Sequence, residues 1–433
     1  MGWPGRRCMS SQEFLAASRR HETRIFCAVL SPGSSNGHEV SGRGITGMAS
    51  GRDGRSRRSR GKTGRRARRL MIYGSTGFTG RLIAQRAVEV GLAPVLAARD
   101  EERVRRQAEL LGTPWRTVGL GSIEALTEAL SDIEAVVHAA GPFIVTAPPM
   151  LEACLRAGTH YLDVSGELPV FREALGRDSE ARRAGVMLMP GAAWSVATTD
   201  CLAAHVAARL PGAKYLRLGM TQSRLYSRGT ARSAFGLMSS EVVIRRNGRL
   251  TSVPIGRMER DFDYGEGERT SMALSWPDAV TAYHTTGIPN IEAYMQVGAA
   301  ARVLAPLTAR IGEAFQLPIL RSVLRLGAAA LPEGPAQAAR ELARPVIVAE
   351  AEDAWRRVSS ARLTTADGYD FTALAAVAIA ERVIGGEFEP GFQTPGRVYG
   401  ADFVLSIDGT TRIDLDLRAG EIARGTTLPQ PVA

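Results

Sequence analysis

A glycine-rich segment near residue 75 has the spacing of a dinucleotide-binding site. It reads Gly74-Ser75-Thr76-Gly77-Phe78-Thr79-Gly80, with a glycine at every third position. This spacing is a variant of the G-x-G-x-x-G fingerprint. In that fingerprint glycines allow a tight turn, a close approach of the main chain to a pyrophosphate, and close packing of a helix on a strand. An ordinary turn at the start of a helix is the alternative interpretation.

The flanking elements favour the dinucleotide interpretation. An apolar run at 70–73 predicts a strand, a helical pattern follows at 81–90, and a second strand is expected at 94–98. That strand ends in Arg99-Asp100. An NADP site needs a guanidinium there for the 2′-phosphate, so we assign Arg99 to the phosphate and Asp100 to the N-cap of a helix at 101–111. The alternative for Arg99 is a solvated surface charge.

Strands and helices continue to alternate as far as residue 189, which predicts an α/β fold with a doubly wound parallel sheet of the Rossmann type. The strand expected at 135–139 ends beside Ala140-Gly141-Pro142, where small residues would let a cofactor ribose and nicotinamide lie against the backbone. His138 is predicted to be a packed strand residue rather than a base. The remaining expected strands are 115–118, 161–164 and 186–189, and the helices are 122–130, 149–157 and a stretch within 169–184.

The pattern changes after a helix expected at 200–210. Turn signals such as Gly265-Glu266-Gly267 separate short apolar runs, which predicts a second, α+β substrate domain. We expect an arm at 1–69, a nucleotide-binding domain at 70–200 and this second domain at 201–433, with a segment near 385–400 returning to the first. Its expected strands are 215–220, 256–264, 271–276, 345–352, 355–364 and 403–407, and its expected helices are 291–313, 318–330 and 371–384.

The positive charge is concentrated in the N-terminal arm. The net charge of the chain is +10, and residues 1–69 hold 16 of the 54 Lys and Arg residues but only 4 of the 44 Asp and Glu residues. This arm lacks apolar periodicity, and three explanations remain open: an upstream start with the natural protein beginning at Met48 or near Met71, a disordered basic tail, or a targeting peptide. Nucleic-acid binding would depend on the arm, because the rest of the chain is nearly neutral.

Other classes of site are not expected. The four cysteines form no CxxC pair or Cys/His cluster, so we predict neither a disulfide scaffold nor a metal site. No apolar stretch reaches the ~20 residues of a membrane span, and a soluble, cytoplasmic protein is expected.

Taken together, the motifs resemble the saccharopine dehydrogenase-like oxidoreductases, a family that includes saccharopine reductase and bacterial trans-acting enoyl reductases. The resemblance implies an NADP-binding Rossmann domain followed by a substrate domain that often helps to form homodimers. Relatives tend to carry two aspartates after 189–191; here Asp200 matches the second, whereas Ser195 replaces the first. The segments that carry the resemblance are 71–80, 97–99, 140–143, 157–167 and 391–395.

A reductase also needs a proton donor beside the hydride. The Tyr-x-x-x-Lys pair of short-chain dehydrogenases is absent, because neither Lys62 nor Lys214 has a tyrosine four residues earlier. Tyr161, Asp163 and Glu167 surround a strand tip and are candidates to orient substrate or relay a proton; the alternative is that they fix the 159–167 turn by hydrogen bonds.

Two further residues, Arg228 and Tyr283, are candidates to contact an acidic or carbonyl group of the substrate, the alternative being surface or packing roles. The sequence therefore predicts an NADPH-dependent oxidoreductase that reduces a C=N or C=C bond of a small metabolite or of a lipid or polyketide intermediate. A non-catalytic NADP-binding sensor or partner subunit is the alternative that the loss of aspartate at Ser195 permits. A nucleic-acid binder acting through the arm is a third function, against which the near-neutral body argues.

Overall fold

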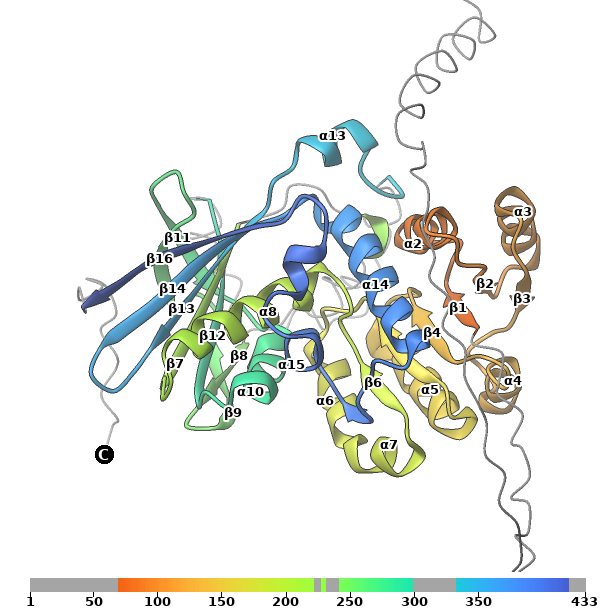
Figure 1. The fold of residues 1–433 in the computed structure, drawn as a ribbon, viewed down its shortest axis with the longest axis horizontal. Coiled ribbons are helices and arrows are strands. Elements are labelled where there is room, and N and C mark those ends of the chain that lie inside the picture. The colour runs from red at the N-terminus through yellow and green to blue at the C-terminus, as the bar shows by residue number, and fades with distance from the viewer. Residues whose placement is uncertain (1–68, 222–226, 231–240, 299–331, 420–433) are drawn as a thin grey trace, which may run out of the picture. The chain divides into compact units, whose positions relative to one another are not determined.

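The structure is a computed structural model and describes residues 69–221, 227–230, 241–298 and 332–419 (Figure 1). The arm expected at 1–69 lies outside these residues except for its last position. The described strands form two sheets, one of seven strands and one of nine.

The first sheet is parallel and has the strand order β15-β6-β5-β4-β1-β2-β3. The order reverses between β1 and β4, and the carboxyl ends of these strands meet at one edge, which is where ligands bind in such sheets. β15 pairs with β6, so the segment expected to return near 385–400 reaches this sheet. The strands are β1 (Leu70–Tyr73), β2 (Val95–Ala98), β3 (Trp115–Thr117), β4 (Ala135–His138), β5 (His160–Asp163), β6 (Met187–Met189) and β15 (Gly391–Phe392).

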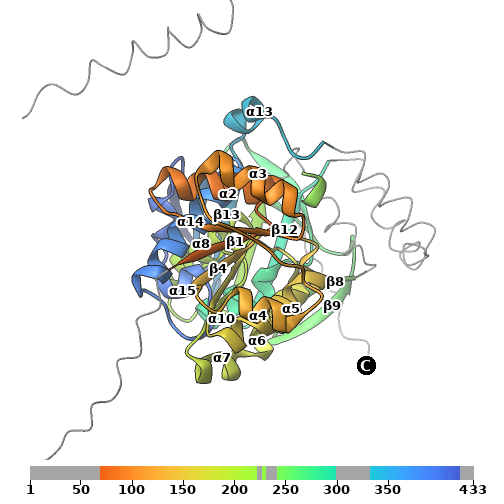
Figure 2. The same cartoon turned by 90° about the vertical axis from the view of Figure 1, so that its right-hand side faces the viewer.

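Helices cover both faces of the first sheet (Figure 2), which explains why β1, β2, β4 and β5 are buried along their whole length and are mainly apolar. One apolar cluster packs four helices on one face, and a second cluster packs helices on the opposite face. The first set is α2 (Phe78–Glu89), α3 (Glu101–Leu111), α8 (Trp194–Arg209) and α14 (Gly368–Gly385), and the second includes α4 (Ile123–Ala129), α5 (Phe143–Ala157), α6 (Leu168–Gly176) and α7 (Asp178–Ala184).

The second sheet is mixed, with the path β10-β11-β12-β7-β13-β14-β16 and a hairpin of β8 and β9 attached to β12. Among its described strand pairs, only β12–β7 is parallel. Its strands are β7 (Tyr215–Met220), β8 (Glu241–Arg246), β9 (Arg249–Pro254), β10 (Glu259–Asp263), β11 (Glu268–Ala273), β12 (Asn290–Gln296), β13 (Val346–Glu352), β14 (Arg357–Thr364) and β16 (Thr411–Ala419). Short helices accompany it: η2 (Pro277–Ala279), α10 (Thr281–Thr286), α13 (Gln337–Leu342), α15 (Pro395–Tyr399) and η4 (Phe403–Ser406).

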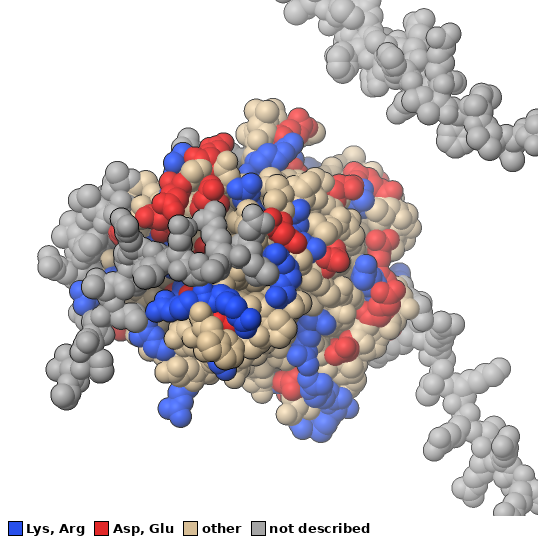
Figure 3. Space-filling model, turned by 60° about the vertical axis from the view of Figure 1, so that its left-hand side comes forward, with Lys and Arg blue, Asp and Glu red and all other residues tan. Residues whose placement is uncertain are grey.

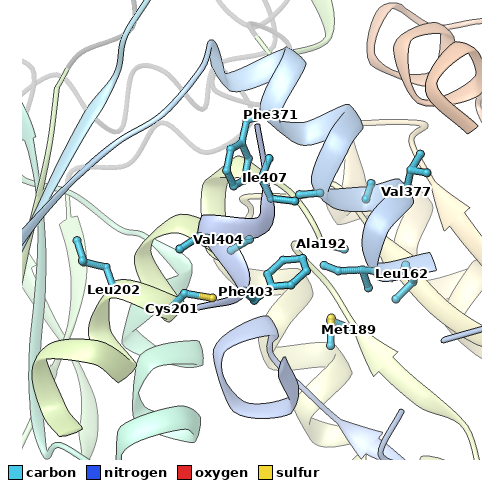
Figure 4. Close-up of a cluster of buried hydrophobic side chains, with 14 of the residues drawn as sticks. Leu162, Met189, Ala192, Cys201, Leu202, Phe371, Val377, Phe403, Val404 and Ile407 are labelled. Carbon is cyan, nitrogen blue, oxygen red and sulfur yellow. The ribbon is translucent and has the colours of Figure 1, made fainter. Parts of the chain in front are cut away.

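Helix α8 joins the two sheets through one continuous apolar core. Its residues Cys201 and Leu202 are fully buried and belong to the same cluster as Leu162 of β5 and Phe371 of α14 (Figure 4). Strands β7, β13 and β14 contribute to this cluster as well. The predicted class, a Rossmann sheet with a second α+β domain, is confirmed, and the domain boundary expected at residue 200 falls inside α8.

Several expected elements are wrong or incomplete. Residues 403–407 were expected as a strand, but Phe403–Ser406 form η4. Phe403, Val404 and Ile407 are buried while Leu405 is exposed, a spacing that fits a helical turn. Residues 290–296 form β12 instead of the start of a helix, and the rest of 291–313 and all of 318–330 lie outside the described residues apart from 297 and 298. Strands β8, β9 and β16 were not predicted.

Charges of both signs are intermixed on the face shown in Figure 3. No helix among the described residues is long and apolar enough to cross a membrane.

Candidate functional site

At two of the three glycines in the turn after β1, a side chain would collide with neighbouring atoms. Gly74 has φ +80°, and a Cβ atom there would lie 2.7 Å from the Cβ atom of Ala140. At Gly80 a Cβ atom would collide with the carbonyl oxygen of Gly74 and lie 2.9 Å from the Cα atom of Ser75. Gly77 is less constrained, since its φ is −75° and its Cβ atom would lie 3.3 Å from the Gly74 oxygen. The turn therefore lies tightly between α2 and the end of β4.

The N-terminus of α2 carries no side-chain cap. Gly77 stands at the N-cap with no side-chain acceptor, and the first turn contains no acidic residue. The first amides of a helix lack partners within the helix, and the helix dipole favours an anion there. A pyrophosphate fits this end of α2 for both reasons. Phe78 and Thr79 begin the helix, and the hydroxyl of Ser75 is buried without a hydrogen-bond partner among the described residues.

Side chains of α2 and α3 hold the turn in place. The carbonyl oxygen of Thr76 accepts hydrogen bonds from Arg81 Nη1 and Arg103 Nη2, both at 3.1 Å. The carbonyl oxygen of Ser75 accepts one from Gln107 Nε2 at 3.0 Å. The contacts of Arg103 and Gln107 depend on the packing of α3, and sequence reasoning did not identify them.

Arg99 directly follows β2 and is exposed. Burial raises the pKa of Tyr73 to about 12, and the positive charge of Arg99 partly opposes this rise. Asp100 caps α3 by accepting the amide of Arg103 at 3.1 Å, so the predicted cap is confirmed. The assignment of Arg99 to a phosphate stays a prediction.

The segment Ala140–Pro142 lies between the end of β4 and the start of α5. Glu167, which follows β5, caps α5 in place of a local residue: its two carboxylate oxygens accept the amides of Phe143 at 3.0 Å and Ile144 at 2.6 Å. Only 3% of Glu167 is exposed. Glu167 is therefore bonded to the two residues that directly follow the Ala140–Pro142 segment.

We expect Glu167→Ala to lower the free energy of unfolding by ~1–3 kcal/mol, because it leaves two amides at the start of α5 without an acceptor. Denaturant unfolding monitored by circular dichroism measures this loss. Glu173→Ala, a change on the neighbouring helix α6 at a residue that pairs with Arg177 at the surface, is the control and should cost less than ~1 kcal/mol. Equal losses for the two variants would contradict the capping role.

Tyr161 and Asp163 are both fully buried. The Tyr161 hydroxyl donates to Asp163 Oδ2 at 2.6 Å, and Asp163 Oδ1 accepts the amides of Ser165 and Gly191, both at 2.8 Å. Burial raises the pKa of Asp163. These bonds join the turns that follow β5 and β6, so the geometry favours the structural alternative, and a proton relay through this pair stays a prediction.

His138 is buried in β4, and its Nε2 atom lies 3.1 Å from the hydroxyl oxygen of Thr146. Burial lowers its pKa to about 3, so the ring is neutral at physiological pH. It is in ring contact with Tyr73, Phe143 and Tyr161. This is the packing role that the sequence predicts for it.

Ser195 and Asp200, the two positions at which the family resemblance implies aspartates, have different surroundings. The Ser195 hydroxyl donates to the carbonyl oxygen of Ser165 at 2.9 Å, next to the end of β5. Asp200 is buried and accepts the Thr285 hydroxyl at 2.6 Å and the Gly396 amide at 2.7 Å. Asp200 therefore links α8, α10 and α15.

The structure separates the two candidate substrate residues. Arg228 lies near the glycine turn, because its amide donates to the carbonyl oxygen of Glu333, whose carboxylate pairs with Arg81 of α2. Tyr283 lies near the β8–β9 turn, where the Arg245 guanidinium stacks on its ring at 3.8 Å. Arg245 pairs with Ile291, which lies next to the first residue of β12. The last residue of β12, Gln296, lines a cavity at the opposite end of that strand. Tyr283 is 37% exposed and Arg245 covers one face of its ring, so the geometry favours a surface or packing role over contact with substrate.

The cavity that Gln296 lines has a volume of about 480 Å³. Two of the residues that line it, Trp194 and Tyr369, lie in or against the part of the chain expected to bind the nucleotide. Trp194 precedes Ser195 at the start of α8, and the Tyr369 ring contacts Phe78 edge-on at a centroid distance of 5.2 Å. Sequence reasoning did not identify this cavity, since its lining comes from segments far apart in the chain. Among the described residues no cluster of three or more His, Cys, Asp or Glu side chains could hold a metal ion.

Comparison with known proteins agrees with this geometry. Residues 70–189 match the family model of the saccharopine dehydrogenase NADP binding domain. The trans-acting enoyl reductase of Mycobacterium bovis is 33% identical over 113 residues, which are 24% of this chain and 27% of that protein. The corresponding reductase of Mycobacterium leprae is 34% identical over 113 residues, with the same shares. The match thus spans about a quarter of the length of these curated relatives.

The fold extends further than the sequence match. Saccharopine dehydrogenase (L-Glu forming) from Saccharomyces cerevisiae superposes with a TM-score of 0.56 at 12% identity, covering 81% of this chain and 100% of that one. The predicted resemblance to saccharopine dehydrogenase-like oxidoreductases is confirmed, and residues 70–189 are the part of the chain that is similar to the NADP-binding domain of that family.

Proposed function

We propose that the protein is an NADPH-dependent oxidoreductase of the saccharopine dehydrogenase-like type, which reduces a C=N or C=C bond of a small metabolite or of a lipid or polyketide intermediate. The observation that carries this proposal is the glycine turn. Its two space-restricted positions, Gly74 and Gly80, lie at the uncapped start of α2 within a segment that matches an NADP-binding family.

In this proposal the pyrophosphate binds at the start of α2, and the nicotinamide half lies over the carboxyl ends of β4 and β5. When bound, NADPH supplies a hydride to an electrophilic carbon of the substrate. The residues that would hold it are Gly74, Ser75, Thr76, Gly77, Phe78, Thr79, Gly80, Arg99, Ala140, Gly141 and Pro142.

The chain's own residues then act mainly by positioning. Glu167 holds the start of α5, and with it Ala140–Pro142, while Tyr161 and Asp163 hold the turns after β5 and β6. The cavity beside Trp194 and Tyr369 is the place where we expect the substrate, because it adjoins both domains.

A second function, an NADP-binding sensor or partner subunit without turnover, is supported by Ser195. This hydroxyl is bonded to the backbone of Ser165, at the position where the family resemblance implies a carboxylate. Incubating the protein with NADPH and a panel of imines and enoyl thioesters separates the two functions. Loss of the 340 nm absorbance with any substrate supports the oxidoreductase, whereas tight binding without turnover across the panel supports the sensor. Light scattering of the purified chain tests the homodimer that the resemblance implies.

We expect Arg99→Ala to weaken NADPH binding by ~1.5–3 kcal/mol and to change NADH binding little, since the guanidinium is proposed to pair with the 2′-phosphate. Titrations of cofactor fluorescence measure both affinities. The exposed Arg106 of α3, replaced by Ala, is the control for general loss of positive charge. Equal losses for NADPH and NADH on Arg99→Ala would refute the assignment.

A further inference from the structure

A second arginine lies beside the glycine turn on the side of Arg99. Arg103 is in the first turn of α3, four residues after Arg99, and both side chains are exposed. One of its terminal nitrogens, Nη2, donates to the Thr76 carbonyl at 3.1 Å, which holds the guanidinium against the turn. The other nitrogens have no hydrogen-bond partner among the described residues.

Arg103 forms no ion pair with a described carboxylate, unlike its neighbours, although it is near enough to Glu333 to help lower the pKa of that carboxyl. In the same helix Arg105 pairs with Glu109 at 2.6 Å and Arg106 pairs with Glu102 at 2.5 Å. Arg81, which shares the Thr76 carbonyl with Arg103, pairs with Glu333 at 2.6 Å. Within the described part of the chain, neither Arg99 nor Arg103 forms an ion pair.

Two exposed guanidiniums without ion pairs therefore flank the end of β2 and the glycine turn. An anion bound between them would be attracted by both positive charges. A phosphate monoester suits such a pair, because its oxygens accept charge-assisted hydrogen bonds from the planar donor forks of two arginines.

We infer that Arg103 is a second ligand of the cofactor's 2′-phosphate, opposite Arg99, and so determines the preference for NADPH over NADH. This inference rests on the proposed function, because it concerns the same cofactor site. The hydrogen bond to Thr76 would then fix the long side chain of Arg103 before the phosphate binds, which lowers the conformational entropy lost on binding.

A purely structural role for Arg103 makes a different prediction. If the side chain only supported the turn through Thr76, its loss would disturb the pyrophosphate end of the site and weaken both cofactors alike. If it binds the 2′-phosphate, the loss falls on NADPH alone, since NADH carries a hydroxyl at that position.

The test is a set of fluorescence titrations of the full chain with NADPH and NADH. We expect Arg103→Met to weaken NADPH binding about tenfold or more and NADH binding by less than about threefold. Arg106→Met removes the same charge from the same helix and should leave both affinities within about twofold. Arg103→Lys keeps the charge but loses the planar fork, and should fall between wild type and Arg103→Met.

Salt adds a second measurement, because ion pairs at an exposed site weaken as the ionic strength rises. The wild-type affinity for NADPH should fall with salt more steeply than that of Arg103→Met. Equal weakening of NADPH and NADH, or an unchanged affinity for NADPH, would overturn the inference while leaving the proposed function intact. A wild-type chain that binds neither cofactor would overturn both.

Discussion

Gly80→Ala is expected to abolish cofactor binding and to lower the free energy of unfolding by at least ~3 kcal/mol. The added methyl group would overlap the Gly74 carbonyl oxygen and approach the Ser75 backbone. Both obstacles are main-chain atoms between a buried strand and a helix, so neither can rotate away as a side chain can. To accommodate the methyl group, α2 must move off the turn, which removes the amides that we propose for the pyrophosphate.

Urea unfolding and an NADPH titration of the same variant check this result. Gly121→Ala is the matched control, because a Cβ atom at that position has no neighbour within 4 Å. It should unfold within ~1 kcal/mol of wild type and bind NADPH normally. Gly77→Ala should fall between the two, since its methyl group meets only the Gly74 oxygen at 3.3 Å. If Gly80→Ala bound NADPH as tightly as wild type, the turn could not be the pyrophosphate site.

The first sheet could be predicted well from the sequence because its signals are local. Most of its strands are short apolar runs followed by a helical pattern, and such alternation predicts a doubly wound parallel sheet. The second sheet was predicted less completely. In β12 the apolar residues Ile291, Ala293 and Met295 alternate, but they merge with an Ala-rich stretch, and that composition favoured a helix. These residues form a strand instead because they pair with β7, which lies far away in the sequence.

The candidate site divides in the same way. The glycine turn and the Asp100 cap were visible because each depends on neighbours within a few residues. Glu167 was singled out as a candidate, but its contact with the start of α5 joins residues more than twenty positions apart. Arg103 was missed since its importance comes from the packing of α3 against the turn, which no local pattern encodes.

The other large effect that we predict concerns the pH dependence of stability, and it arises from two buried carboxyl groups, those of Asp278 and Asp200. Asp278 of η2 is fully buried, and no hydrogen bond of ordinary geometry reaches its two carboxyl oxygens from the described residues, although the nearby Thr199 hydroxyl partly opposes the rise in its pKa. Burial raises its pKa to about 8, and the charge of Asp200 on α8 adds to the rise. Burial also raises the pKa of Asp200 to about 6, although bonds from Thr285 and Gly396 oppose this. At neutral pH Asp278 is therefore held mainly as the neutral acid.

The direction of the pH effect follows from proton binding. An unfolded aspartate ionises near pH 3.9, whereas folded Asp278 keeps its proton until about pH 8. Between these values the folded state binds more protons than the unfolded state, so the stabilising contribution is complete below about pH 4 and is lost as the pH rises. Buried histidines work in the opposite direction at low pH: burial lowers the pKa of His138 to about 3 and that of His160 to about 4, so their contribution is lost as the pH falls.

Because the aspartate and the histidines all contribute to the pH dependence of stability, we compare the free energy of unfolding of a variant with that of the wild type. This difference isolates the contribution of Asp278. Asp278→Asn stays uncharged at every pH, so we expect it to be more stable than wild type by about 2 kcal/mol or more at pH 8.5 and nearly equal at pH 4.5. Urea unfolding at a series of pH values measures this difference. Asp261→Asn, at an exposed position of β10, should show none. A constant offset between Asp278→Asn and wild type at all pH values would mean that Asp278 is already ionised in the fold, with a partner that neutralises it.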